Sequence, residues 1–281
     1  MTWQWANLSK ALPAGFPTTC VDIAAPLANP GPTSVPHVYF VGSDGSLWRC
    51  AIPLADFEQV PTPGKVTRVA VYPNGSVACV TKDDPAAAYI LPNGNINGRW
   101  DKQNQYFGAG PNYQPFDVCA ARDGSVWFVL ARGQQWIATN HGPTFEFEVP
   151  ALIAVAGFTQ PVSDANAGGA WGIVGDPKSN ASGSIAFCNG AWELRPNQTQ
   201  TYLEGVVDIS TSPNYLWMVK TDGTVWTTQD GISEIRMGSP FLAQRISGGY
   251  ISESDTRTHL GEVVFAIGKD GVPNIWQDGP L

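Results

Sequence analysis

The feature that most constrains the fold is an internal repeat of four short apolar runs. It is clearest in residues 206–238, where turn residues separate the runs VVDIS, YLWMVK, TVWTT and SEIRM. Short apolar or alternating runs bounded by turn residues are typical of β-strands. Asp222-Gly223 lies between the second and third runs, and this dipeptide favours a two-residue hairpin turn with positive φ at both central positions. The segment therefore predicts a four-stranded antiparallel sheet.

The same unit of four apolar runs recurs along the rest of the chain. The last unit lacks a fourth run, and residues 2–8 supply one that resembles the fourth runs of other units. Six units of about 47 residues, closed by the N-terminal strand, predict an all-β, six-bladed β-propeller that forms a single domain over residues 1–281. Closure in this way covers the exposed edge of the last sheet. The predicted blades span residues 20–61, 67–101, 116–149, 152–196, 206–238, and 243–277 completed by 2–8.

Alignment of the units places aromatic residues in two columns. A tryptophan that recurs at one position of every blade packs one blade against the next, or exposes a flat face for a ligand. We assign the second-run column to packing and take the third-run column as candidate sugar-stacking positions. The second-run column contains Tyr39, Trp127, Trp171 and Trp217, and the third-run column contains Trp48, Tyr89, Trp136, Trp226 and Trp276.

The Asp-Gly motif occurs at two different places in the repeat. Asp44-Gly45 and Asp222-Gly223 lie between the second and third runs, whereas Asn74-Gly75 and Asp123-Gly124 lie between the first and second runs. A binding site copied between blades would keep one place in the unit. We therefore interpret the motif as turn chemistry that precedes an aromatic strand.

The pattern V-D-I-x, a tryptophan in the next run, D-G and then V-W resembles the tectonin repeat. The clearest copy is "VVDIS…YLWMVKTDGTVW". Proteins of that family form β-propellers, and several are lectins that act in defence or recognition. The resemblance implies a non-catalytic carbohydrate-binding protein without a cofactor, whose partners are glycans or glycoconjugates held at several sites between blades. Some tectonin modules are protein-interaction scaffolds, so that function is kept as a second alternative.

Composition and charge exclude several classes of function. The formal net charge of −8 argues against a nucleic-acid partner, which requires clustered Lys and Arg. No apolar stretch approaches the length of a membrane span, so membrane insertion is not expected. The N-terminus lacks a basic region and a long apolar region, and the five cysteines contain no CxxC motif. These features predict a cytoplasmic protein with buried free thiols, and they are compatible with non-classical export and with oligomers.

An enzyme or small-molecule binder that uses the central channel or the rim loops is the main alternative. No G-x-S-x-G, HExxH or Walker motif is present, so no catalytic residue is assigned. The first runs of the units are expected to line the channel, and three of their aspartates share one column. They could cap backbone groups, or bind a cation while the arginines partly neutralise them. The candidates are Asp22, Arg68, Asp117, Asp208 and Arg245 in the channel, with His37 and His259 at the rim.

Overall fold

In the computed structural model the described residues form β-strands joined by turns and loops, with one short 3-10 helix, η1 (Pro92–Gly94). The described part of the chain contains no helix with the length and hydropathy of a membrane span. The structure describes residues 3–27, 36–52, 54–83, 85–103, 114–121, 124, 126–132, 135–140, 146–149, 152–157, 170–174, 184–188, 192–194, 205–212, 215–229, 233–250 and 262–278.

The described strands assemble into six four-stranded antiparallel sheets, numbered by the order of their innermost strands. Sheet 1 contains β2 (Cys20–Ala24), β3 (His37–Gly42), β4 (Leu47–Ala51) and β5 (Ala55–Val60). Sheet 2 contains β6 (Val66–Val71), β7 (Val77–Thr81), β8 (Ala87–Leu91) and β9 (Asp101–Lys102). Sheet 3 contains β10 (Gln114–Ala120), β11 (Val126–Arg132), β12 (Gln135–Asn140) and β13 (Glu146–Val149).

The remaining three sheets have the same order of strands. Sheet 4 contains β14 (Leu152–Gly157), β15 (Ala170–Val174), β16 (Ser184–Cys188) and β17 (Trp192–Leu194). Sheet 5 contains β18 (Val206–Thr211), β19 (Leu216–Lys220), β20 (Val225–Thr228) and β21 (Ile235–Met237). Sheet 6 contains β22 (Ala243–Tyr250), β23 (Glu262–Gly268), β24 (Pro273–Asp278) and β1 (Trp3–Asn7).

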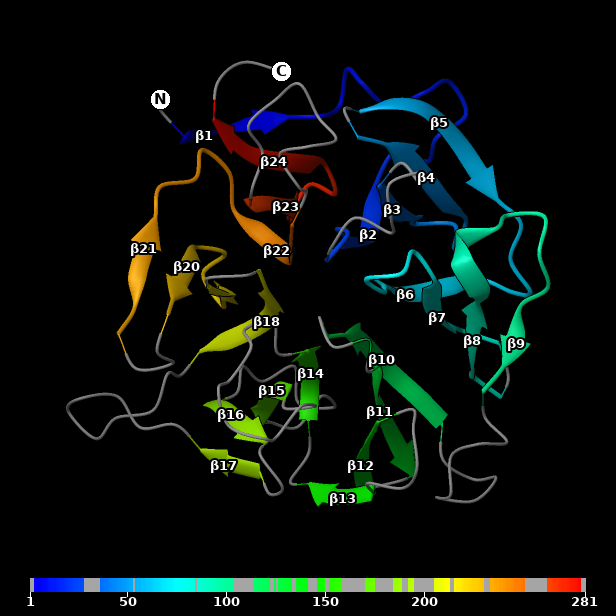
Figure 1. The fold of residues 1–281 in the computed structure, drawn as a ribbon. Helices are drawn as coiled ribbons and strands as arrows, with labels where there is room; N and C mark the ends of the chain where they lie inside the picture. The colour runs from blue at the N-terminus through cyan, green and yellow to red at the C-terminus, as the bar shows by residue number, and fades with distance from the viewer. Residues whose placement is uncertain are drawn as a thin grey trace.

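The sheets are arranged around a common centre, with their first strands innermost (Figure 1). Each first strand contacts the first strand of the next sheet, in the sequence β2, β6, β10, β14, β18 and β22, and β22 contacts β2. The predicted all-β propeller with four-stranded antiparallel blades is therefore confirmed.

The N-terminal strand completes sheet 6. β1 pairs antiparallel with β24, from Trp3 opposite Asp278 to Asn7 opposite Asn274. The repeat in the sequence predicted this pairing, and it joins the two ends of the chain through backbone hydrogen bonds. The pairing also leaves β24 without an open edge.

The hydrophobic core lies between adjacent sheets. The second-run aromatics occupy it: Tyr39 is 2% exposed, Trp127 2% and Trp217 1%. Tyr39 packs with residues of sheets 1 and 2, and Trp217 with residues of sheets 5 and 6. The assignment of this column to packing is confirmed. Large rings at one position fill the space that opens between neighbouring twisted sheets.

The Asp-Gly hairpins are three-residue turns, so the prediction of two-residue turns was wrong. Gly42 N donates to Ser46 O (2.8 Å), and Gly45 N donates to Gly42 O (2.9 Å). Gly45 has φ of 84°, whereas Asp44 keeps a negative φ. A tight turn followed by glycine in the left-handed region is the usual three-residue hairpin. The same pair of hydrogen bonds closes the turns at residues 72–76, 220–224 and 268–272.

The turn glycines also contact the following sheet. Gly45 O accepts a hydrogen bond from Val66 N (2.9 Å), and Gly223 O accepts one from Ala243 N (2.8 Å). A Cβ atom on Gly45 would lie 2.7 Å from the Cβ atom of Lys65. Glycine is required at this position by its backbone conformation and by the close approach of the next sheet. The Asp-Gly motif is therefore part of the contact between sheets.

Candidate site in the central channel

The third-run tryptophans were predicted to stack on sugars, but their polar edges are used within the turns. Trp48 Nε1 donates to Ser46 Oγ (2.9 Å), which donates to Asp44 Oδ1 (2.6 Å). Trp226 Nε1 makes the same contact with Thr224 Oγ1 (2.7 Å). Each indole is therefore fixed by the hydroxyl group two residues before it.

The rings of this column also pack against the protein. Trp48 lies 5.5 Å from Phe16, and Trp276 lies 5.3 Å from Trp217, measured between ring centroids. Lys220 Nζ lies 4.5 Å above the ring of Trp226, a cation–π contact. Tyr89 packs against the core between sheets 1 and 2, and the side chain of Trp136 lies outside the described residues.

A second column lies on the innermost strands, directly after a β-bulge in each strand. In sheet 1 the pairing register shifts between Cys20 and Asp22, and in sheet 2 it shifts between Val66 and Arg68. A bulge changes the direction of the side chain that follows it. The residues at this position of the six strands are Asp22, Arg68, Asp117, Ala154, Asp208 and Arg245. All five predicted channel residues are therefore in one column, and Ala154 occupies the same position on β14 of sheet 4.

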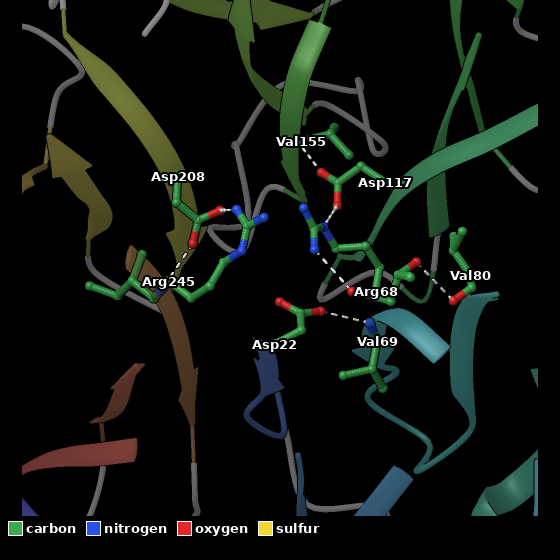
Figure 2. Close-up of polar contacts among 10 residues, drawn as sticks. Asp22, Arg68, Val69, Val80, Asp117, Val155, Asp208 and Arg245 are labelled. Atoms are coloured by element: carbon green, nitrogen blue, oxygen red, sulfur yellow. Dashed lines mark hydrogen bonds and ion pairs between the residues drawn. The ribbon is translucent and has the colours of Figure 1, made fainter. Parts of the chain in front are cut away.

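The three aspartates of the column share one structural role, as the capping interpretation predicted. All are buried, with exposed fractions of 6–7%. Each uses Oδ2 to accept a hydrogen bond from a backbone N–H of the following sheet (Figure 2). The pairs are Asp22 with Val69 (2.8 Å), Asp117 with Val155 (2.8 Å) and Asp208 with Ile246 (2.7 Å).

The second carboxylate oxygen distinguishes Asp22 from the other two. Asp117 Oδ1 lies 3.3 Å from Arg68 Nε, and Asp208 Oδ1 lies 3.0 Å from Arg245 Nη1. Asp22 Oδ1 has no hydrogen bond or ion pair with any described residue. In Figure 2 the Asp22 carboxylate lies below the guanidiniums of Arg68 and Arg245. One acceptor oxygen therefore remains available in the channel.

Burial controls the protonation of these carboxyl groups. It raises the pKa of Asp22, while the positive charges of Arg68 and Arg245 oppose the rise. Burial likewise raises the pKa of Asp117 to about 6, and it raises the pKa of Asp208. Removing a carboxylate from water disfavours its charged form. The channel therefore contains carboxyl groups that take up protons closer to neutral pH than an exposed aspartate does.

A small cavity of about 70 Å³ lies beside the column, and Arg245 and Ala154 are not among its lining residues. Its polar lining includes Asp22, Arg68, Asp117 and Asp208, together with hydroxyl groups such as that of Ser247. A volume of this size holds several water molecules, and the polar lining provides partners for them. The cavity can therefore accept a small polar molecule together with water.

The rim histidines and the possible cation site were the remaining predictions for the channel. His37 begins β3 and is not among the residues that line the cavity, and His259 lies outside the described residues. Within the described ranges, no group of three His, Cys, Asp or Glu side chains could hold a metal ion. Cys20, Cys50 and Cys79 are buried thiols outside any disulfide, as expected, whereas Cys119 is only partly buried and the side chain of Cys188 lies outside the described residues.

Comparison with known proteins identifies the fold and no family. No protein-family profile matches the chain, and no curated protein matches it in sequence. Among solved structures, it is similar to the gluconolactonase XC5397 from Xanthomonas campestris, with 11% identity, 97% of this chain and 88% of that chain covered, and a TM-score of 0.63. Virginiamycin B lyase from Staphylococcus aureus gives 13% identity, coverage of 99% and 100%, and a TM-score of 0.56. YCF48 from Cyanidioschyzon merolae is 15% identical, with 98% of this chain and 99% of that chain covered and a TM-score of 0.52.

These similarities correct the prediction of a tectonin-type lectin. The similar structures include a gluconolactonase and a lyase, which are enzymes and not lectins. The packed third-run rings agree with this correction, since Trp48 and Trp226 are held by their own turns. The resemblance to the tectonin repeat predicted the propeller correctly. The prediction of sugar binding that was drawn from it was wrong.

Proposed function

We propose that this chain is an enzyme that binds a small polar molecule in the central channel and hydrolyses an ester or lactone. The observation that carries the proposal is Asp22 Oδ1, a carboxylate oxygen with no hydrogen-bond or ion-pair partner among the described residues. Asp22 lines the cavity together with Arg68, and the charge of Arg245 also acts on it. A carboxylate oxygen that lines a cavity can accept a hydrogen bond from a ligand or a water molecule. Such a group is typical of a functional site.

We further propose that the six sheets are the six blades of one complete ring. The contacts of each innermost strand with the next, including β22 with β2, support a closed ring. The pairing of β1 with β24 supports closure by the N-terminal strand. In such a ring the bulge residues converge on one axis, which makes the channel the natural place for a single site.

In the proposed reaction Asp22 acts as the general base. It accepts a proton from a water molecule as the water oxygen attacks the carbonyl carbon. Arg68 and Arg245 stabilise the negative charge that develops on the carbonyl oxygen. When the ring C–O bond breaks, Asp22 returns the proton to the leaving oxygen. The product is a hydroxy acid, which then ionises to its carboxylate.

The similarity to a gluconolactonase directs the choice of first substrates. Lactones are small, polar and uncharged, and ring opening needs only a base, a water molecule and stabilisation of an oxyanion. The site provides the base and the stabilising charges without a metal ligand set among the described residues. Small lactones without ring substituents are therefore the first compounds to test, because the cavity is only about 70 Å³.

The test follows lactone opening by the release of acid, with purified protein and a pH indicator. We expect Asp22→Asn to reduce the rate about 10²- to 10⁴-fold, the usual contribution of a general base. The amide oxygen still accepts the Val69 N–H, so the fold is preserved. Asp44→Asn, at an exposed turn, is the matched control and should retain the rate. An Asp22→Asn variant as active as the native protein would exclude the mechanism.

A further inference from the structure

We propose that the channel binds a small carboxylate anion between Arg68 and Arg245, and that Asp22 takes up one proton when the anion binds. The inference rests on the proposed function in that it uses the same cavity and the class of product that lactone opening yields. It goes further by assigning a second ligand class and a coupled proton.

The arginines retain N–H donors that no described residue accepts, and Arg68 lines the cavity. Arg68 uses Nε for Asp117 and donates from Nη1 to Thr67 O (2.9 Å). Arg245 uses Nη1 for Asp208. No other hydrogen bond or ion pair joins either guanidinium to a described residue, although each has five N–H groups. In Figure 2 the two guanidiniums point toward one another from opposite sides of the channel. A carboxylate placed between them could accept hydrogen bonds from both.

Charge balance requires a proton to accompany the anion. Three buried aspartates face two arginines, which leaves one negative charge in excess when all are ionised. A second negative charge in this buried space would be strongly unfavourable. Protonation of one carboxylate returns the site to the single excess negative charge that it has without the anion, and it provides an O–H donor for the anion.

Asp22 is the carboxyl group best placed to take up this proton. Asp117 and Asp208 each have an arginine partner, and Asp22 has no ion pair with any described residue. The charges that act on Asp22 are those of Arg68 on β6, Arg245 on β22 and Asp208 on β18. Asp22 in turn raises the pKa of Asp117 on β10 and of Cys20 on its own strand, in both cases after the larger effect of burial.

The coupling makes the affinity depend on pH. Burial raises the pKa of Asp22, and a bound anion raises it further, by the reciprocity of linked equilibria. Above the pKa of Asp22 in the free protein, binding must take a proton from solution. The affinity is therefore expected to fall about tenfold for each unit of rising pH in that range.

The probe is glycolate, a small hydroxy carboxylate that is fully ionised from about pH 5 to about pH 8. Glycolamide has the same shape without the charge and serves as the matched ligand control. Isothermal titration calorimetry at several pH values gives the affinity. Repetition in two buffers of different ionisation enthalpy gives the number of protons taken up.

Two variants separate the anion site from the proton site. Asp22→Asn is expected to bind glycolate with the same affinity at every pH, and at least about tenfold more tightly than the native protein at about pH 8. Arg245→Lys keeps the charge beside Asp208 but loses the planar set of donors, so it should bind glycolate about tenfold more weakly. Thermal unfolding verifies that both variants are folded.

The proposal is overturned if the affinity of the native protein for glycolate does not change with pH. It is equally overturned if Asp22→Asn retains the pH dependence, or if glycolamide binds as well as glycolate. Glycolate is not hydrolysed, so the result does not depend on turnover. Glycolate binding without lactone opening would reject the proposed reaction alone, and lactone opening without glycolate binding would reject this inference alone.

Discussion

Aspartates serve two regions of this molecule in opposite ways. The turn aspartates Asp44 and Asp222 accept hydrogen bonds from the residue two positions later in their own turn. The channel aspartates Asp22, Asp117 and Asp208 accept theirs from the backbone of the following sheet. The first group lies in solvent and the second is buried. The same side chain therefore shapes a turn in one region and joins two sheets in the other.

The difference in solvent reverses the effect on protonation. Hydrogen bonds from Ser46 lower the pKa of Asp44, and hydrogen bonds from Thr224 lower the pKa of Asp222. Burial raises the pKa of Asp117 to about 6 although it also accepts a hydrogen bond. Hydrogen bonds to a carboxylate favour the charged form, and loss of water disfavours it. In the channel the loss of water is the larger effect.

The largest effect on stability is expected when the carboxylate of a channel aspartate is removed. Asp208→Ala leaves Arg245 and the Ile246 N–H buried without their partner, so it should lower the free energy of unfolding by about 3–5 kcal/mol. Asp222→Ala removes an acceptor in an exposed turn and should cost about 1 kcal/mol. Urea denaturation of both variants measures the difference. Equal losses would contradict the contrast between the two regions.

The next effect is a pH dependence of stability, which the buried channel aspartates should produce and the exposed turn aspartates should not. An aspartate with a raised pKa retains its proton in the folded state after the unfolded chain has lost it. Asp117 should therefore reduce stability as pH rises from about 4 to about 6, by about 2–3 kcal/mol.

The measurement compares unfolding of the native protein and of Asp117→Asn at several pH values in this window. The amide still accepts the Val155 N–H, so the variant isolates the proton. Its stability should decline less across the window than that of the native protein. Identical pH profiles would show that Asp117 ionises normally.

The smallest effect concerns the hydroxyl group that joins the turn to its tryptophan. Thr224→Val removes the hydrogen bonds to Asp222 and Trp226 and keeps the shape of the side chain, so it should cost about 0.5–1 kcal/mol. The fluorescence of Trp226 should change because its N–H loses its acceptor. Thr221→Val, at an exposed position of the same turn, is the control. An unchanged stability and spectrum would show that the hydroxyl does not hold the indole.

The repeat predicted the fold well because strand length, turn residues and apolar runs are local properties of a sequence. The Asp22, Asp117 and Asp208 column was also visible, since V-D-I and F-D-V stand at the same place in their units. Arg68 and Arg245 were not placed in that column. Their common position depends on a bulge in each strand, and only the pairing register reveals it.

The prediction of sugar-stacking tryptophans failed for a physical reason that the sequence did contain. Ser46 and Thr224 stand two residues before Trp48 and Trp226, and on the same face of the strand. That spacing allows the hydroxyl to accept the indole N–H and to donate to the turn aspartate. The composition alone suggested exposed aromatic faces. The hydroxyl at this spacing indicates a ring tied to its own turn.

Ala154 makes the six strands around the channel non-equivalent. A column with identical residues in all six strands would offer a small guest six equivalent orientations, with no preference among them. In this channel aspartates and arginines alternate on five of the innermost strands. The remaining strand, β14 of sheet 4, has Ala154 at this position, with only a methyl group. Restriction to one orientation costs a guest about 1 kcal/mol of rotational entropy, and it fixes which of its atoms faces Asp22. Broken symmetry is what allows a pseudo-symmetric ring to position one bond for one carboxylate.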